Sequence, residues 1–387
     1  MRILFLAPQP FYEERGTPIA VNMLLKVLSE RGEEVDLITY HLGDDVEYEN
    51  VALHRIGKIP FIKTISPGFS PQKLICDFFL FWKAITLLSK FQYQVTHAVE
   101  ESAFMALLFK KIWGIEYVYD MDSRLSSQLI DKYPILGSFS KFFAFMENKV
   151  LREAELILPV NHSLVDDFED LDPDKVIELH DVSLLQNGSG EKVRSIKAEM
   201  GLNGILVMYV GNLEKYQGID LLLESLAEIA TKTNNINLAI IGGKAEDIQK
   251  YEEKTGELGI FSMVRFFGPR PMKNLGDYLS EADILVSPRI SGANTPMKIY
   301  SFLESGKAIV ATNLNTHTQV LNDQVAILVE PNPHAFAKGI IILAENAELR
   351  KRLGKNGRKL ALDKYTFAEF QSSVNRIYDL IDPIPAI

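Results

Sequence analysis

The chain has a single cysteine, Cys76, in 387 residues. One cysteine cannot form an intramolecular disulfide, and no cysteine and histidine residues cluster at metal-ligand spacing, so the sequence argues against a disulfide framework and a structural zinc site. Net positive charge is also absent, since 51 acidic residues outnumber 41 basic ones and the formal charge is -10. Binding to nucleic acid needs a basic surface that displaces counterions, so we expect no nucleic-acid partner.

Long apolar runs are missing as well. The first run, in "MRILFLAPQP", stops at a proline within ten residues, which is too short for a secretory signal. We expect it to form a first strand of a cytoplasmic protein. No G-x-G-x-x-G follows this run, which argues against a dinucleotide-dependent enzyme.

What the chain does contain is a repeating order of a short apolar run, a polar or glycine-rich loop and an amphipathic helix. The expected strands lie at residues 2–8, 34–40, 93–99, 116–122, 154–160, 204–211, 236–243, 263–268, 282–288, 307–313 and 325–331. Apolar runs separated by helices predict parallel sheets covered on both faces. We therefore expect an α/β protein with two doubly wound, Rossmann-like domains facing across a cleft.

Strand signals lapse between Leu184 and Gly204, where Asn, Gly, Ser and Lys accumulate, so we place the domain boundary near Gly190. The predicted organisation is an N-terminal acceptor-side domain at 1–190, a nucleotide-binding domain at 191–364 and a C-terminal helix at 365–387. Apolar residues recur at helical spacing in this last segment. We expect the helix to pack back across the junction.

Two loops that follow strands share glycine, threonine and proline: "RGTPIAVNMLL" from Arg15 and "ANTPMKIYSFL" from Ala293. The spacing predicts Thr17 and Thr295 as helix N-caps with proline in the first turn. Free N–H groups at such a helix end favour phosphate, and the glycines at 16 and 292 allow close approach. The alternative is that Thr-Pro only starts each helix.

Four segments of the second half resemble the retaining GT-B glycosyltransferases of family 4: "YVGNLEKYQGIDLLLESL", "VRFFGPRP", "LSEADILVSPR" and "NTPMKIYSFLESGKAIVAT". The first half is similar to the same family through "RGTPIAVNMLLKVLSERGEEVDLITY" and the region "VTHAVEESAFMALLFKKIWGIEYVYDMDSRL". The resemblance implies transfer of a sugar from a nucleoside diphosphate sugar, with retention of anomeric configuration and without a required metal ion or other cofactor.

The resemblance also implies a set of donor-binding residues: Gly16, Thr17, Gly211, Asn212, Gln217, Arg270, Arg289, Asn294, Thr295, Pro296, Met297 and Lys298. Relatives carry two glutamates where this chain has Ala293 and Ser301, and a lysine where it has Gln217. Glu304 lies one helical turn beyond Ser301, and Lys215 is a further cation near the glycine loop.

In the first domain, relatives place a histidine near the donor sugar, at the position that we align with Asp122. His97, which we expect at the carboxyl end of another strand, is the second candidate catalytic residue. Either residue is equally explained as a loop cap. Glu100 and Glu101 follow and suit the start of a helix.

Three functions remain open at this point. The first is an active retaining glycosyltransferase that builds a polysaccharide or glycolipid. The second is a non-catalytic GT-B protein that binds a nucleotide sugar or a partner enzyme, which the missing glutamates favour. The third is a sugar-nucleotide epimerase of the same fold.

A basic and aromatic segment points to the acceptor. Six cations lie between Leu53 and Phe91 (Arg55, Lys58, Lys63, Lys73, Lys83 and Lys90), against one acid, Asp77. Within it, "FFLFW" at Phe78 to Trp82 would sweep the whole circumference of a helix. Either this helix is fully buried, or it contacts anionic lipid at the inner face of the membrane and presents a lipid-linked acceptor rather than a soluble glycan.

Overall fold

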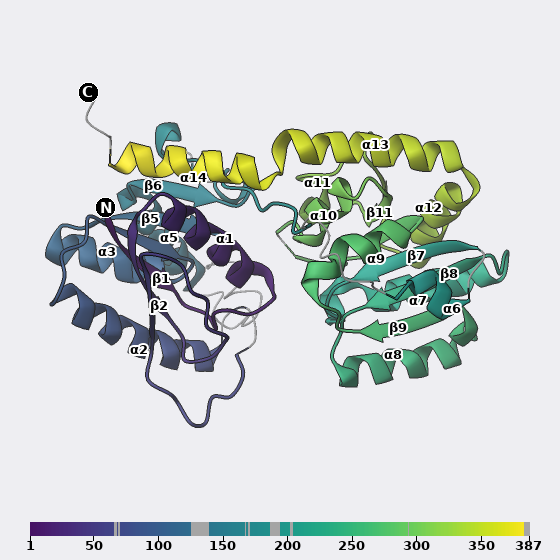
Figure 1. The fold of residues 1–387 in the computed structure, drawn as a ribbon, viewed down its shortest axis with the longest axis horizontal. Helices are drawn as coiled ribbons and strands as arrows, with labels where there is room; N and C mark the ends of the chain where they lie inside the picture. Colours follow the sequence, from purple (N-terminus) through teal and green to yellow (C-terminus); the bar gives the residue numbers. More distant parts are fainter. Residues whose placement is uncertain are drawn as a thin grey trace. The chain divides into compact units, whose positions relative to one another are not determined.

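The computed structural model describes residues 1–65, 68, 70–124, 139–166, 168, 171–185, 194–201, 204–292 and 294–382. The chain divides into two compact units, Met1–His180 with Ala368–Ile387, and Asp181–Phe367. Each unit is a six-stranded parallel sheet with helices on both faces (Figure 1). The expected fold class, two doubly wound GT-B sheets, is confirmed. Gly190, where we placed the boundary, lies outside the described residues.

The sheet of the first unit has the strand order β3-β2-β1-β4-β5-β6. Its strands are β1 (Arg2–Ala7), β2 (Glu34–Thr39), β3 (Val51–Arg55), β4 (Val95–Val99), β5 (Glu116–Met121) and β6 (Leu156–Pro159). The sequence patterns did not predict β3, because this edge strand is only partly buried and ends in polar residues. Two of those residues pair with acids, His54 with Asp36 at 2.7 Å and Arg55 with Asp45 at 2.8 Å.

Helices cover both faces of this sheet. They are α1 (Gly16–Glu30), α2 (Pro71–Leu88), α3 (Ser102–Trp113), α5 (Ser140–Glu153) and α14 (Phe367–Ile381). Alternate residues of a strand point to opposite faces. In β1, Leu4 and Leu6 join the cluster of buried residues from α2 and α3, whereas Phe5 stacks on His97, whose ring stacks on Tyr378 of α14.

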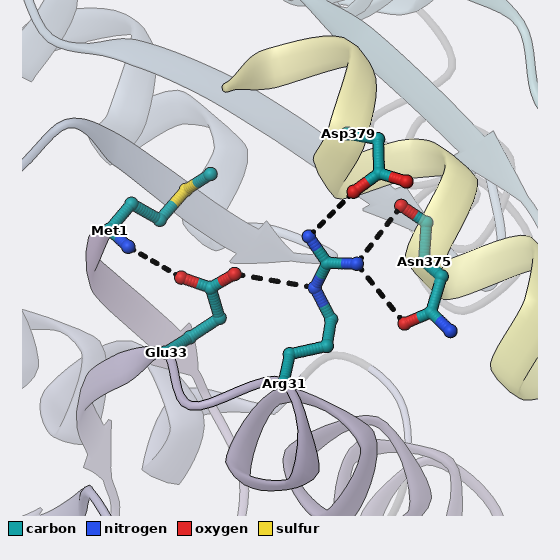
Figure 2. Close-up of polar contacts among 5 residues, drawn as sticks. All are labelled: Met1, Arg31, Glu33, Asn375 and Asp379. Atoms are coloured by element: carbon teal, nitrogen blue, oxygen red, sulfur yellow. Dashed lines mark hydrogen bonds and ion pairs between the residues drawn. The ribbon is translucent and has the colours of Figure 1, made fainter. Parts of the chain in front are cut away.

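The C-terminal helix α14 is held by Arg31, which follows α1 (Figure 2). The Arg31 guanidinium donates to the Asp379 carboxylate at 2.9 Å and to the Asn375 side chain at 3.1 Å. Its Nε donates to Glu33 at 3.3 Å, and the other oxygen of Glu33 accepts from the Met1 amino group at 2.6 Å. These contacts tie a helix at the end of the sequence to the start of the chain.

The second unit has the strand order β12-β11-β10-β7-β8-β9. Its strands are β7 (Ile205–Val210), β8 (Ile236–Ile241), β9 (Val264–Gly268), β10 (Ile284–Ser287), β11 (Ala308–Thr312) and β12 (Ala326–Val329). Its helices are α6 (Ile196–Met200), α7 (Ile219–Ala230), α8 (Ala245–Glu257), α9 (Leu275–Glu281), α10 (Lys298–Glu304), α11 (Asn315–Thr318), α12 (Pro333–Glu345) and α13 (Ala347–Lys364). Separate clusters of buried residues line the two faces of the sheet.

Each sheet has one point where the strand order reverses. From β7 the chain continues to β8 and β9 on one side, and β10 to β12 lie on the other side, so the reversal falls between β7 and β10. In the first unit it falls between β1 and β4. Open parallel sheets bind ligands outside the carboxyl ends of the strands at this point. No helix of the described residues has both the length and the apolar character to cross a bilayer.

Candidate functional site

The loops that follow β7 and β10 pack backbone against backbone at the reversal point of the second unit. Gly218 has a φ of 74°, and a Cβ at this position would lie 2.0 Å from the carbonyl oxygen of Pro288. Gly211 has a φ of 144°, and a Cβ there would lie 3.3 Å from the Nζ of Lys298. Only glycine allows the two loops to approach so closely. The two loops thus bring the start of α10 next to the end of β7.

Lys298, the first residue of α10, points into this junction. Its Nζ lies 4.0 Å from the centroid of the Tyr209 ring and donates to Gln217 Oε1 at 3.2 Å. Burial lowers the pKa of Lys298 well below its ordinary value, and Arg289 adds repulsion. We expected Gln217 to replace a cation as a donor. Instead, its carbonyl oxygen accepts a hydrogen bond from Lys298.

Arg289, in the loop after β10, is the second cation of this junction and is partly buried. Its Nη1 donates to the carbonyl oxygen of Asn294 at 2.6 Å and to Thr316 Oγ1 at 2.8 Å, and its guanidinium lies 5.0 Å from the centroid of the Tyr216 ring. Burial lowers the pKa of Arg289. Its Nε is buried and has no hydrogen-bond partner within the described residues.

Among the residues that the structure describes, no ion pair includes Lys298 or Arg289, although both side chains are partly buried. A buried charge is costly unless an opposite charge accompanies it. Two such cations at the ligand-binding edge of a parallel sheet are therefore suited to an anionic ligand, and to a diphosphate in particular.

Thr295 is not the N-cap of α10, so that prediction is wrong. The cap position is Met297, which makes no side-chain cap, and Thr295 Oγ1 donates to Gln319 Oε1 at 3.0 Å. The Pro296 carbonyl accepts from the N–H of Ile299 at 2.8 Å. The turn at residues 296 and 297 thus precedes the helix and separates Thr295 from the helix start.

Thr17 is not an N-cap either. Helix α1 begins at Gly16, its cap position is Arg15, and no side chain caps it. The Thr17 hydroxyl instead bonds to the carboxylate of Asp122. A Cβ at Gly16 would have no atom within 4 Å, so this glycine leaves open space at the start of α1.

Of the two positions where relatives carry glutamates, 293 and 301, the structure describes only the second. Ala293 lies outside the described residues. Ser301 is fully buried in α10, and its Oγ accepts a hydrogen bond from the N–H of Leu184 at 3.0 Å. Ser301 therefore has a structural role and offers no group to a ribose. Glu304 is the last residue of α10.

The other predicted donor residues and Lys215 lie after β7 and β9. Asn212 is exposed, and its carbonyl oxygen accepts from the Tyr209 hydroxyl at 2.6 Å. Lys215 is exposed in the same loop. Arg270 follows β9, the edge strand, and its guanidinium is 3.9 Å from Glu199. The structure therefore does not bring Arg270 together with Lys298.

The sequence patterns missed His317, which is fully buried below this site in α11. Its Nδ1 is 2.9 Å from the Thr312 carbonyl oxygen and its Nε2 is 2.8 Å from the Ser287 hydroxyl. Burial lowers the pKa of His317 to about 4, so the ring is neutral near pH 7. Since a carbonyl only accepts, Nδ1 donates to it and Nε2 accepts from Ser287. The polar run "TNLNTHTQ" after the β11 strand was the available signal.

In the first unit, Asp122 and Glu100 lie close together at the carboxyl ends of β5 and β4. Burial raises the pKa of both carboxyl groups, and each has a neighbouring acid that raises it further. Hydroxyl groups oppose the shift: Thr17 bonds to Asp122, and Ser123 Oγ donates to Glu100 at 3.2 Å. Asp122 thus lies where a proton or a hydroxyl group of a ligand can be held.

His97 does not lie at the end of its strand, as we expected, but in the middle of β4. It is fully buried. Its Nδ1 is 2.9 Å from the Tyr378 hydroxyl of α14, and its Nε2 is 3.3 Å from Asp120. With both ring nitrogens engaged, His97 helps to fix α14 and is not available to a substrate.

No group of three or more His, Cys, Asp or Glu residues within the described chain could hold a metal ion. The absence of a metal requirement stays a prediction.

Residues 194–360 match the family described as glycosyl transferases group 1. The D-inositol 3-phosphate glycosyltransferase of Corynebacterium diphtheriae is 21% identical over 386 residues, which cover 94% of this chain and 89% of that protein. The protein of the same description from Corynebacterium glutamicum is 24% identical over 222 residues, 54% of this chain and 53% of that protein. The chain thus matches some of its curated relatives over only about half of their length.

Solved structures share the fold over the whole chain. The sucrose-phosphate synthase of Thermosynechococcus elongatus has a TM-score of 0.77 and 18% identity, and the match covers 97% of this chain and 98% of that one. The Anabaena protein HepE, solved in complex with UDP, has a TM-score of 0.75 and 14% identity, with 98% and 100% covered. With two doubly wound sheets and a match to the glycosyl transferases group 1 over residues 194–360, the chain has the GT-B fold, and its second unit is similar to this family.

Proposed function

We propose that the second unit binds the diphosphate of a nucleoside diphosphate sugar through Lys298 and Arg289, and that the enzyme transfers the sugar with retention of configuration. The carrying observation is that both cations are partly buried and have no acidic partner among the described residues. When the glycosidic bond breaks, negative charge grows on the leaving diphosphate, and fixed cations in a water-poor site stabilise it. HepE, which has a similar fold, was solved with UDP bound, and this is in line with such a donor.

The test is a panel of ligands in which only the phosphate changes. Uridine, UMP, UDP and UDP-glucose, and the corresponding guanosine and adenosine series, would be compared by thermal shift and titration calorimetry. A ligand at 100 times its Kd adds about 2.7 kcal/mol to the free energy of unfolding. We expect a diphosphate to bind much more tightly than the matching nucleoside. Equal binding of nucleoside and diphosphate in every series would overturn the proposal.

We assign Asp122 of the first unit to the reacting sugar or the acceptor. It takes the place of a histidine in the resembling family, and Thr17 orients its carboxylate. Asp122→Asn should lower turnover about tenfold or more while nucleotide affinity stays unchanged, since a group that acts in the transition state affects kcat more than binding. If the variant had normal turnover, Asp122 would be a loop cap with no part in the reaction.

For the acceptor we propose a glycan or a lipid-linked glycan that contacts the first unit. Two curated relatives that the chain matches are described as D-inositol 3-phosphate glycosyltransferases, and the phosphatidyl-myo-inositol mannosyltransferase of Mycobacterium tuberculosis is a relative with a lipid acceptor in its name.

One observation favours a second candidate, a GT-B protein that binds a nucleotide sugar without transferring it. Ser301 takes the place of a family glutamate and is committed to the Leu184 N–H, so one contact to the donor is lost. Slow hydrolysis of the bound nucleotide sugar to nucleoside diphosphate and free sugar separates the two candidates. Tight binding without any release of diphosphate would favour the non-catalytic protein.

A further inference from the structure

The outer face of α2 is apolar, whereas the outer face of a helix on a globular domain is usually polar. Five large apolar side chains on it have exposed fractions between 38% and 59%: Leu74, Ile75, Phe78, Phe79 and Trp82. The opposite face of the same helix, with Cys76, Leu80 and Ala84, is fully buried. The prediction of a fully buried helix is therefore wrong, and α2 presents an apolar stripe to the surroundings.

Helix α3, which neighbours α2 (Figure 1), also exposes apolar side chains. There Leu108, Ile112 and Trp113 have exposed fractions of 42%, 57% and 43%. Phe81 and Phe109 connect the two helices, since their stacked rings are 5.8 Å apart. We call the exposed apolar residues of the two helices, together with the exposed Phe61 of the preceding loop, the α2–α3 surface.

The unpaired charges near the α2–α3 surface are positive, since the two acids at α3, Glu116 and Glu153, are paired with Lys110 and Lys111. Four exposed or half-exposed cations surround it and form no ion pair with the described residues: Lys58, Lys63, Lys83 and Lys90. Lys83 lies four residues after Phe79 on α2, which places it beside the apolar stripe, and Lys90 lies in the turn that follows the helix. Residues 56–65 and α3 contain no acid.

Two of the three charged residues of α2 face the other way. Asp77, the one acid of this helix, is bonded to the Tyr40 hydroxyl. Lys73 is buried and paired with Glu101. We had counted Lys73 among the surface cations, and this is wrong because its ammonium group lies in the interior, where that carboxylate compensates its charge.

We propose that the α2–α3 surface docks on a bilayer that contains anionic lipid, with the aromatic side chains at the headgroup level and the lysines on the lipid phosphates. Tryptophan and phenylalanine next to lysine, without acids, are the composition of interfacial helices. A chain of net charge -10 would be repelled from such a membrane unless it offered a locally cationic face. This inference goes beyond the proposed function, because lipid binding needs no nucleotide.

The two tryptophans of the chain, Trp82 and Trp113, both belong to the α2–α3 surface and report on it directly. The full chain would be mixed with vesicles of phosphatidylcholine alone or with 30% phosphatidylglycerol, without nucleotide. We expect a blue shift of tryptophan emission and co-sedimentation with the anionic vesicles only, reduced by salt. Brominated lipid should quench the emission, which a protein partner or a second copy of the chain cannot do.

Two variants separate the apolar from the charged contribution. Phe78→Ser with Trp82→Ser should weaken partitioning at least tenfold, and Lys83→Gln with Lys90→Gln about fivefold per lysine. Phe261→Ser with Leu362→Ser, at exposed apolar residues of the second unit, is the matched control and should change nothing. Circular dichroism checks that each variant folds.

Three results would overturn the proposal. One is equal binding of wild type and of both variants to anionic vesicles. Another is equal binding to neutral and anionic vesicles, or to neither. The third is a dimer in solution that the Phe78 and Trp82 changes dissociate, which would assign the surface to a second copy of the chain. None of these results would affect nucleotide binding by the second unit.

Discussion

Lys298 and Arg289 lie partly buried in the second unit, and the charge of Arg289 disfavours the protonated form of Lys298. The lowered pKa of Lys298 has a consequence for stability. Below the ordinary lysine pKa the unfolded chain binds the proton more tightly than the folded one, so stability rises with pH between the lowered folded pKa and 10.5. In the free protein this cation is therefore destabilising.

Lys298→Met should have opposite effects on stability and on binding. We expect the free energy of unfolding of the ligand-free protein to rise at pH 7, because a buried charge is removed. Affinity for the best nucleoside diphosphate should fall about 10- to 100-fold, the loss of a charge-assisted hydrogen bond of about 1.5–3 kcal/mol. Thermal unfolding with and without the nucleotide measures both.

Lys215→Met is the matched control for this change, since Lys215 is exposed in the adjoining loop, and it should alter neither quantity. A Lys298→Met protein with unchanged affinity would argue against contact with the diphosphate.

His317 provides a pH-dependent contribution of known sign. Its folded pKa is lowered to about 4 from 6.5, so the unfolded chain binds more protons between these values, and stability is lost as pH falls through this window. The loss amounts to about 3 kcal/mol when complete. In His317→Gln this part of the slope should vanish, as followed by urea unfolding at pH 7.5, 6 and 5. If the free energy of unfolding changed with pH in the same way in wild type and variant, His317 would not be the source of this pH dependence.

Some of these residues could be identified from the sequence and others could not. Gly211, Arg289 and Lys298 were predicted because glycines and cations after strands are visible in the sequence. The partners were not visible: Gln217 accepts from Lys298, Thr295 donates to Gln319, and both contacts join residues that are far apart in the chain or separated by a turn. Short-range sequence patterns predicted that Thr295 caps helix α10. In the structure Thr295 instead makes a hydrogen bond to Gln319, which is distant in the sequence.

At the scale of elements, strands with continuous apolar runs were predicted, and the edge strand β3 was not. Central parallel strands are buried on both faces and therefore read as apolar runs. An edge strand pairs on one side only, and β3 carries His54 and Arg55, whose partners Asp36 and Asp45 come from other segments. Tertiary contacts of this kind leave no periodic signal in the strand itself.

Helix α14 is attached to the first unit by several polar contacts that all depend on the side chain of Arg31. Arg31→Met should loosen α14 and cost about 1–2 kcal/mol, because Asp379, Asn375 and Glu33 lose a shared charged donor that is only partly exposed. Hydrogen exchange of the α14 amides should become faster, while the amides of the second unit keep their rates.

Arg376→Met is the control for Arg31→Met, since Arg376 is exposed on the same helix and makes no ion pair with the described residues. Equal exchange of α14 in both variants would mean that the apolar face, with Val374, Ile377 and Tyr378, holds the helix by itself.

For the whole molecule, we expect sugar transfer without a divalent metal ion. The proposed site stabilises the leaving diphosphate with two cationic side chains, which supply the charge that a metal ion supplies in other transferases. Turnover should be the same in EDTA and in magnesium. Loss of transfer in EDTA, with recovery on addition of magnesium, would contradict this expectation.

The first unit is completed by residues that the ribosome makes after the entire second unit. Its sheet and most of its helices precede Asp181, but α14 follows the entire second unit in the sequence. At ordinary rates of synthesis, roughly ten seconds or more pass before this helix emerges. During that time Phe5 and His97 lack the covering ring of Tyr378, so the nascent first unit exposes an apolar face to chaperones while the second unit, which is continuous, can already fold.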